Sequence, residues 1–148
     1  MQTDTNNDKT VDQLNSFLRG ELSAVETYRQ ALSAVESVPH RSTLEQCARS
    51  HQARAELLRE EVLRRGAEPS KDSGAWGTFA KAIEGAAKGL GEKTAIAALE
   101  SGEDHGRDDY RRDIDKLDAA ARQLIETRVL PEQLRTHDAM SALKKQLS

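Results

Sequence analysis

The sequence predicts an all-α protein, a four-helix bundle built from two helical hairpins that one long crossover joins. Apolar residues recur at steps of three and four along four segments, as amphipathic helices require, and no segment alternates as a strand would. Aromatic residues make up only 3% of the chain, so the core must come from Leu, Val, Ile and Ala. Those residues suit helix-on-helix packing better than a sheet, which favours aromatic and β-branched side chains.

The one long break in the helical pattern divides the chain into two similar halves. This break is rich in glycine, serine and proline and has no apolar periodicity, which is typical of a connection. A single long connection between two hairpins distinguishes this layout from a simple up-and-down bundle. The expected divisions are a disordered tail at 1–9 and a bundle at 10–148, with a hairpin at 10–66, the crossover at 67–91 and a hairpin at 92–147.

Local signals mark the ends of the helices. Gly66 should end the second helix, and Asp118 offers an N-cap for the last one. Pro131 falls inside the last helical pattern, where it should kink the helix or leave the carbonyl of Thr127 locally unpaired. Within the crossover we expect a short helix at 76–88, and we expect Trp76 to pack against the bundle.

Charge and composition narrow the classes of partner. The net charge is −3 with both signs interspersed, so we expect neither nucleic acid nor an anionic membrane as a partner. No segment is long and apolar enough to cross a membrane, and the polar N-terminus lacks the apolar core of a secretory signal. The single cysteine, Cys47, cannot form an intramolecular disulfide and fits a reducing cytoplasm. We therefore expect a cytoplasmic protein in which Cys47 is a small buried residue.

Each half of the chain carries the same short pattern. A Gly-Glu pair is followed after six residues by a tyrosine, and the next helix places a histidine on its apolar stripe. The residues are Gly20, Glu21, Tyr28 and His51 in the first half, and Gly102, Glu103, Tyr110 and His137 in the second.

The spacing of this pattern has geometric content. Residues equidistant from the turn of an antiparallel hairpin lie at the same level along it. The midpoint between Glu21 and His51 is residue 36, and that between Glu103 and His137 is residue 120; both fall beside expected turns. The two carboxylates and two imidazoles should therefore converge in the core of one bundle.

Such a set of side chains could hold a metal ion. A buried carboxylate is costly without a partner, and carboxylates with imidazoles are ligands for iron, manganese or zinc. Glu21, His51, Glu103 and His137 would supply four ligands, and Glu100 could add a fifth. The alternative is a polar core without metal, in which glutamates pair with histidines and tyrosine hydroxyls. We therefore expect either no cofactor or a single transition-metal ion.

These motifs carry a resemblance to the ferritin-like superfamily, which includes rubrerythrins and bacterioferritins. Glu21-x-x-Ala24-x-x-x-Tyr28 resembles the first metal-ligand helix of that superfamily, and Glu103 with Tyr110 resembles its third helix. The resemblance implies a ferritin-like four-helix bundle in which Tyr28 and Tyr110 lie just outside the ligands.

The chain also resembles a bacterial family of ferritin-like four-helix proteins that is a domain of unknown function. The resemblance covers roughly residues 10–147 and rests on Gly102-Glu103-Asp104, on Tyr110 and on His137-Asp138.

The sequence departs from the di-iron members of the superfamily at two matching places. In those proteins a bridging glutamate precedes each histidine by three residues. Here those positions are Ala48 and Leu134, neither of which can bind a metal. A complete di-iron centre is therefore not expected.

The charged run from Arg54 to Arg65 reads as a solvated helix face with i,i+4 pairs.

Two functions remain open at this point. The first is a bacterial ferritin-like protein with a reduced metal site, acting in stress response or metal handling. The second is a structural or interaction protein that keeps the bundle without metal chemistry, so that the chain would not be an enzyme. No nucleophile with an attendant base and no phosphate loop is present, and no catalytic residue is assigned. In either case we expect a homo-oligomer, a dimer above all, and the protein partner stays open.

Overall fold

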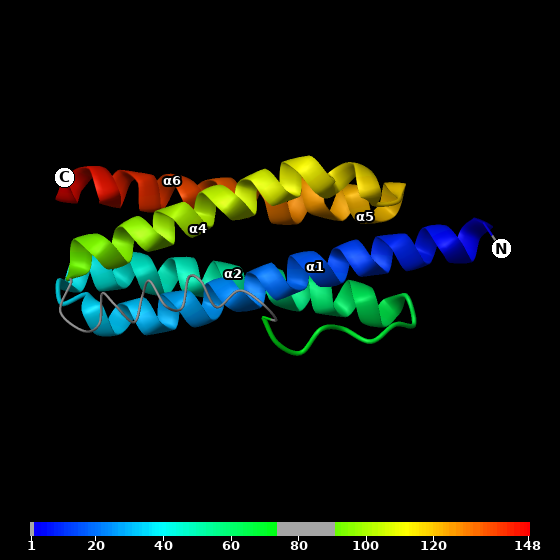
Figure 1. Cartoon of the computed structure of the whole chain (residues 1–148), viewed down its shortest axis with the longest axis horizontal. Coiled ribbons are helices and arrows are strands. Elements are labelled where there is room, and N and C mark those ends of the chain that lie inside the picture. Colours follow the sequence, from blue (N-terminus) through cyan, green and yellow to red (C-terminus); the bar gives the residue numbers. More distant parts are fainter. Residues whose placement is uncertain (1, 74–90) are drawn as a thin grey trace.

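The computed structural model describes residues 2–73 and 91–148, and in them the chain folds into four long helical segments (Figure 1). Among these residues there is no β-strand, so the prediction of an all-α protein is confirmed. The expected helix at 76–88 and Trp76 lie outside the described residues. The segments are α1 (Gln2–Ala31), α2 (Val38–Arg64), α4 (Glu92–Asp113) and a last one made of α5 (Ala119–Leu124), the π-helix η4 (Ile125–Val129) and α6 (Leu130–Leu147).

The segments pair as two antiparallel hairpins, α1 with α2 and α4 with α6 (Figure 1). A short connection that contains the 3₁₀ turn η1 (Leu32–Ala34) joins the first pair, and η3 (Ile114–Lys116) precedes the turn of the second. The long connection between the hairpins returns the chain to the other end of the bundle, so that α2 and α4 run in the same direction. Further contacts join α1 to α4 and α2 to α6, which closes the bundle.

The helix ends follow the local signals in most places. Gly66 adopts a φ of +77° after α2, and the N–H groups of Gly66 and Ala67 bond back to the carbonyls of Leu63 and Val62. Asp118 caps α5, because its Oδ1 accepts from the N–H of Ala121 at 3.0 Å. Both expected signals are confirmed.

The N-terminal segment differs from the expected tail, because α1 already begins at Gln2 and extends past the ends of the other helices in Figure 1. Two long-range contacts hold this end. Asn7 Oδ1 accepts from Arg65 at 3.1 Å, and Thr10 Oγ1 accepts from the N–H of Asp118 at 3.0 Å. Their partners lie far away in the sequence, so the local pattern of residues 1–10 does not reveal them.

The core consists of two apolar clusters with polar side chains between them. One cluster lies towards the N-terminal end of α1, and the other lies towards the turn between α1 and α2. The first contains Val11, Leu14, Phe17, Leu18, Ala55, Leu58, Val62, Tyr110, Leu117, Ala121, Ile125 and Val129. The second contains Tyr28, Ala31, Val35, Leu44, Cys47, Ala95, Ile96, Leu99, Met140 and Leu143, so Cys47 is buried as expected.

The last helical segment accommodates Pro131 through a change of helix type. Proline has no N–H to donate, and its ring crowds the carbonyl four residues earlier, which is that of Thr127. The structure places the π-helix η4 over Ile125–Val129, so Thr127 lies within it and Pro131 falls in the first turn of α6. A π-helix inserts one extra residue into the helical repeat, which rotates the face that follows it.

Candidate functional site

Three of the four expected ligand residues meet in the polar layer between the two apolar clusters. Glu21 comes from α1, His51 from α2 and Glu103 from α4, and each is at most 3% exposed. His51 Nδ1 lies 2.8 Å from Glu21 Oε2, and His51 Nε2 lies 2.7 Å from Glu103 Oε2. Since both ring nitrogens face carboxylate oxygens, the geometry fits an imidazolium that donates one hydrogen bond to each glutamate.

The two tyrosines of the repeated pattern bond across the halves of the chain. The hydroxyl of Tyr28 donates to Glu103 Oε2 at 2.5 Å, and the hydroxyl of Tyr110 donates to Glu21 Oε1 at 2.9 Å. Each tyrosine therefore supports the glutamate of the other repeat. This exchange requires both hairpins to be docked, because neither half contains both partners of a bond.

Arg54 is the main residue of this layer that sequence reasoning missed. The charge pattern predicts a solvated face from Arg54 to Arg65, and for Arg54 this prediction is wrong, because the residue is only 1% exposed. Its Nε lies 3.5 Å from Glu21 Oε2, and its Nη2 donates to Thr136 Oγ1 at 3.1 Å. Its Nη1 donates to Gln133 Oε1. A signal was present, since Arg54 follows His51 by three residues on the apolar stripe of α2.

Two further residues on α6 complete the hydrogen bonding of Glu103. Gln133 Nε2 donates to Glu103 Oε1 at 3.0 Å and to the backbone carbonyl of Glu103 at 2.9 Å. Thr136 Oγ1 donates to Glu103 Oε1 at 2.8 Å. Every buried side-chain polar atom of the described residues has a hydrogen-bond partner. We call Glu21, His51, Arg54 and Glu103 the inner cluster, with Tyr28, Tyr110, Gln133 and Thr136 around it.

The charges of the inner cluster balance. Burial alone would raise the pKa of Glu21, but Arg54 and His51 hold that pKa below its ordinary value. Burial likewise would raise the pKa of Glu103, and His51 lowers it instead. Burial would lower the pKa of His51, yet the two glutamates raise it. Two carboxylates, one imidazolium and one guanidinium therefore sum to zero charge in the polar layer.

Two small cavities lie beside the inner cluster, between α1 and α4. Their volumes are about 40 Å³ and 70 Å³, and both are lined by His51 together with small residues. The small residues that they share are Gly20, Ala24 and Gly102. Cavities of this size have room for water-sized molecules. The glycine of each Gly-Glu pair therefore borders the space that leads to the imidazole.

His137 does not join the other three expected ligands. Its Nε2 faces Asp104 Oδ1 at 2.6 Å, at the outer edge of the seam between α4 and α6. Gln133 and Thr136 point inward in its place, because the buried face of this segment runs through Ile125, Val129, Gln133, Thr136 and Met140. The apolar pattern alone misplaced this face, since two of its members are polar and the π-helix shifts the repeat.

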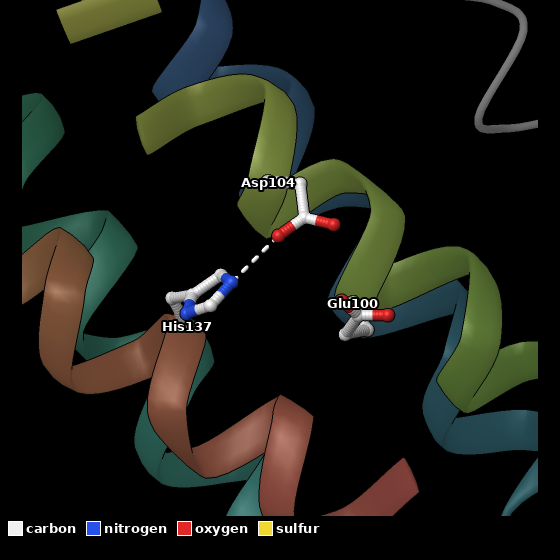
Figure 2. A group of neighbouring side chains, drawn as sticks. All are labelled: Glu100, Asp104 and His137. Carbon is white, nitrogen blue, oxygen red and sulfur yellow. Dashed lines mark hydrogen bonds and ion pairs between the residues drawn. The ribbon is translucent and has the colours of Figure 1, made fainter. Parts of the chain in front are cut away.

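His137 instead gathers with two acidic residues of α4, which include the expected fifth ligand. Figure 2 shows Glu100 and Asp104 on one side of α4 and His137 on the facing side of α6. One ligand atom from each residue lies within 4.8 Å of the other two. Among the described residues, this is the group of His, Cys, Asp or Glu side chains with the spacing of a metal site. We call Glu100, Asp104 and His137 the outer cluster.

The residues of the inner cluster do not fit a two-metal centre. The places of the bridging carboxylates hold Ala48 and Leu134, and Ala48 packs against the apolar core. Arg54 supplies a fixed positive charge 3.5 Å from Glu21. A metal ion bound to the same carboxylate would be repelled by this guanidinium. His51 already bonds both carboxylates through its two nitrogens.

A comparison with protein families places the chain. The model of a domain of unknown function, DUF2383, matches residues 9–116, which is more than half of the chain. The chain belongs to this family. The match covers most of α1 and all of α2 and α4, and so all four residues of the inner cluster. No curated protein and no solved structure matches the chain.

Proposed function

We propose that this DUF2383 protein is a ferritin-like bundle that works without an interior metal, as a structural or interaction protein rather than an enzyme. The observation that carries the proposal is the balanced inner cluster. Arg54 and His51 supply the two positive charges that a metal ion would otherwise bring to Glu21 and Glu103.

The ferritin-like part of the proposal rests on the connection between the hairpins. A four-helix bundle with one long crossover is the arrangement of ferritin-like folds. Here the crossover lets α2 and α4 run in the same direction, and the paired Glu and Tyr of each half face one another in the centre.

A second candidate keeps the interior as a reduced metal site, in metal handling or stress response. The cavities beside His51 favour it, because they offer room next to Glu21 and Glu103. Arg54 opposes it, since a divalent cation would have to share Glu21 with a guanidinium that is almost fully buried. The balance of charge therefore favours the first candidate.

On the part of the surface that residues 2–73 and 91–148 form, contacts with a partner would be mainly polar. Among the described residues the exposed large hydrophobic side chains are Val38 and Leu63, which lie near opposite ends of α2. Two separated side chains do not form the apolar centre of a large obligate interface. The expected homodimer stays a prediction, and on the surface of the described residues it would be held by charged and polar groups. No helix of the described residues has the length and apolarity to cross a membrane.

Metal analysis tests the proposal. The protein is purified without chelator as wild type, Glu21→Gln and Glu103→Gln, and the bound divalent metal per chain is measured by mass spectrometry. We expect equal content in all three, because the inner cluster has no share in metal binding. A lower content in both variants, in protein whose circular dichroism matches the wild type, would overturn the proposal.

A second readout covers the case in which a glutamine variant does not fold. Asp104→Asn removes one residue of the outer cluster and leaves the inner cluster intact. Its midpoint of thermal unfolding should be the same with and without EDTA, because ligand binding to the native state raises stability by mass action. A midpoint that falls on adding EDTA to this variant would count against a metal-free interior.

A further inference from the structure

The outer cluster brings an imidazole and two carboxylates together from two different helices. From this geometry we infer that Glu100, Asp104 and His137 bind one divalent transition-metal ion at the seam of α4 and α6. The site is separate from the inner cluster and does not depend on whether the interior holds a metal. It therefore goes beyond the proposed function.

The positions of the ligands follow from helix geometry. Glu100 and Asp104 are four residues apart, so they share one face of α4 and both reach towards α6 (Figure 2). His137 Nε2 lies 2.6 Å from Asp104 Oδ1, and the three ligand atoms fall within 4.8 Å of one another. Two ligands that are each about 2.1 Å from one ion stand roughly 3–3.5 Å apart, so small side-chain rotations suffice.

The second nitrogen of His137 has a carboxylate beside it. Its Nδ1 lies 3.4 Å from Asp138 Oδ1. A histidine that binds a metal through one ring nitrogen commonly donates the other N–H to a carboxylate, which fixes the tautomer and strengthens the ligand. His137 is placed for this arrangement, with Nε2 towards the acidic pair and Nδ1 towards Asp138.

Two cationic side chains now neutralise the outer cluster. Lys144 Nζ donates to Glu100 Oε2 at 2.9 Å, and Arg107 Nη1 lies 3.1 Å from His137 Nε2 and its Nη2 3.6 Å from Asp104 Oδ1. Lys144 is about half exposed, with 52% of its side chain accessible, so it can move into solvent at little cost. These cations would compete with a metal ion for the same carboxylates.

The donor set points to a class of metal. One imidazole with two carboxylates suits the borderline ions zinc, iron(II), manganese(II) and cobalt(II) rather than calcium, which takes oxygen ligands only. Asp104 is 40% exposed and opens the cluster to solvent, so water would fill the remaining positions around the ion.

Zinc titration of the full chain tests this inference, with a chromophoric chelator as competitor and with Co²⁺ as the spectroscopic probe. We expect one ion per chain and ligand-field absorption of bound Co²⁺. Asp104→Asn and His137→Ala should each weaken zinc binding at least about tenfold. Loss of a residue that only hydrogen-bonds to a ligand already lowers metal affinity by about that factor. Lys144→Gln should strengthen binding several-fold, because a competing charge is gone.

Matched controls separate a built site from general surface binding. His105→Ala removes a histidine of α4 that lies outside the outer cluster, and Asp109→Asn removes an acid of the same helix, which pairs with Arg112. Both controls, and Glu21→Gln in the inner cluster, should bind zinc as the wild type does. The inference fails if the wild type binds no zinc. It also fails if Asp104→Asn and His137→Ala bind as tightly as the controls.

Discussion

At the scale of single residues, His51 is the centre of the buried polar layer. Both of its ring nitrogens face carboxylates, and the residue is almost completely buried. An isolated buried imidazolium would lose its proton, but Glu21 and Glu103 more than offset the cost of desolvation and raise the pKa of His51. The same contacts lower the pKa of both glutamates, so all three groups depend on one another for charge.

These shifts predict how stability depends on pH. A histidine with a raised folded pKa contributes stability that is present below its ordinary pKa of 6.5 and is lost as pH rises through the folded pKa. Glutamates with lowered pKa values contribute stability that is present above 4.5 and is lost as pH falls through the lowered pKa. The free energy of unfolding, measured in urea, should therefore be greatest between these limits.

His51→Gln should remove the alkaline part of this dependence. The variant should be less stable than the wild type at pH 6.5, and the difference should shrink as pH rises, because only the wild type loses a bound proton on unfolding there. His105→Gln is the matched control and should keep the wild-type profile. If the wild type and His51→Gln lose stability in parallel above pH 6.5, His51 is not held as an imidazolium.

Part of the inner cluster could be predicted from single residues. The pattern that occurs twice identified Glu21, His51 and Glu103 of the inner cluster, and Tyr28 and Tyr110 around it. Arg54, Gln133 and Thr136 escaped prediction, since residues of these types are usually exposed and become buried only when they find a partner. Their partner is a carboxylate on another helix, which the local pattern does not contain.

At the scale of elements, the side chain of Gln133 on α6 packs directly against Gly106 on α4. A Cβ built on Gly106 would lie 2.7 Å from Gln133 Nε2, which is nearer than real Cβ contacts. Gln133 in turn holds the side chain and the backbone carbonyl of Glu103. The glycine therefore gives Gln133 the room it needs to reach the inner cluster.

Gly106→Ala tests this packing. Alanine favours a helix over glycine by about 1 kcal/mol, but the new methyl group would push Gln133 off Glu103 at a cost of about 1–3 kcal/mol. We expect a net loss of stability in chemical denaturation. In a Gln133→Ala background the same substitution should be neutral or stabilising, because the obstructing amide is gone. An equal loss in both backgrounds would contradict this account.

The sequence predicts where the helices begin and end better than it predicts which face of each helix is buried. Helices and turns followed from apolar spacing, from Gly66 and from Asp118, and all of these are local. The signals that determine which face of α6 is buried are not local. The π-helix before α6 shifts the helical repeat, and the polar residues Gln133 and Thr136 occupy the buried face. His137 therefore lies at the seam with α4 and not in the interior. The predicted ligand His137 thus belongs to the outer cluster because the π-helix at Ile125–Val129 precedes α6 and shifts its repeat.

At the scale of the whole molecule, the inner cluster joins all four helical segments between two apolar clusters. Its bonds run from α2 to α1, α4 and α6. The hairpin layout of the fold was predictable because each half repeats the other. The meeting of Glu21, His51 and Glu103 was expected from their spacing, but the links from Arg54 to Gln133 and Thr136 of the other half were not. The bundle should therefore unfold as one unit rather than as two hairpins.

Arg54→Leu tests whether the layer couples the halves. The substitution leaves two buried carboxylates with one cation, and removing one partner of a buried ionic group typically costs about 3–5 kcal/mol. Arg59→Leu on the same helix is the control, because Arg59 is exposed and lies 4.0 Å from Glu56; its loss should cost less than about 1 kcal/mol. Since the layer holds both hairpins, the wild type should show a single calorimetric transition whose van't Hoff and calorimetric enthalpies agree. Two transitions in the wild type, or a cost of Arg54→Leu no greater than that of Arg59→Leu, would mean that the ionic layer does not couple the hairpins.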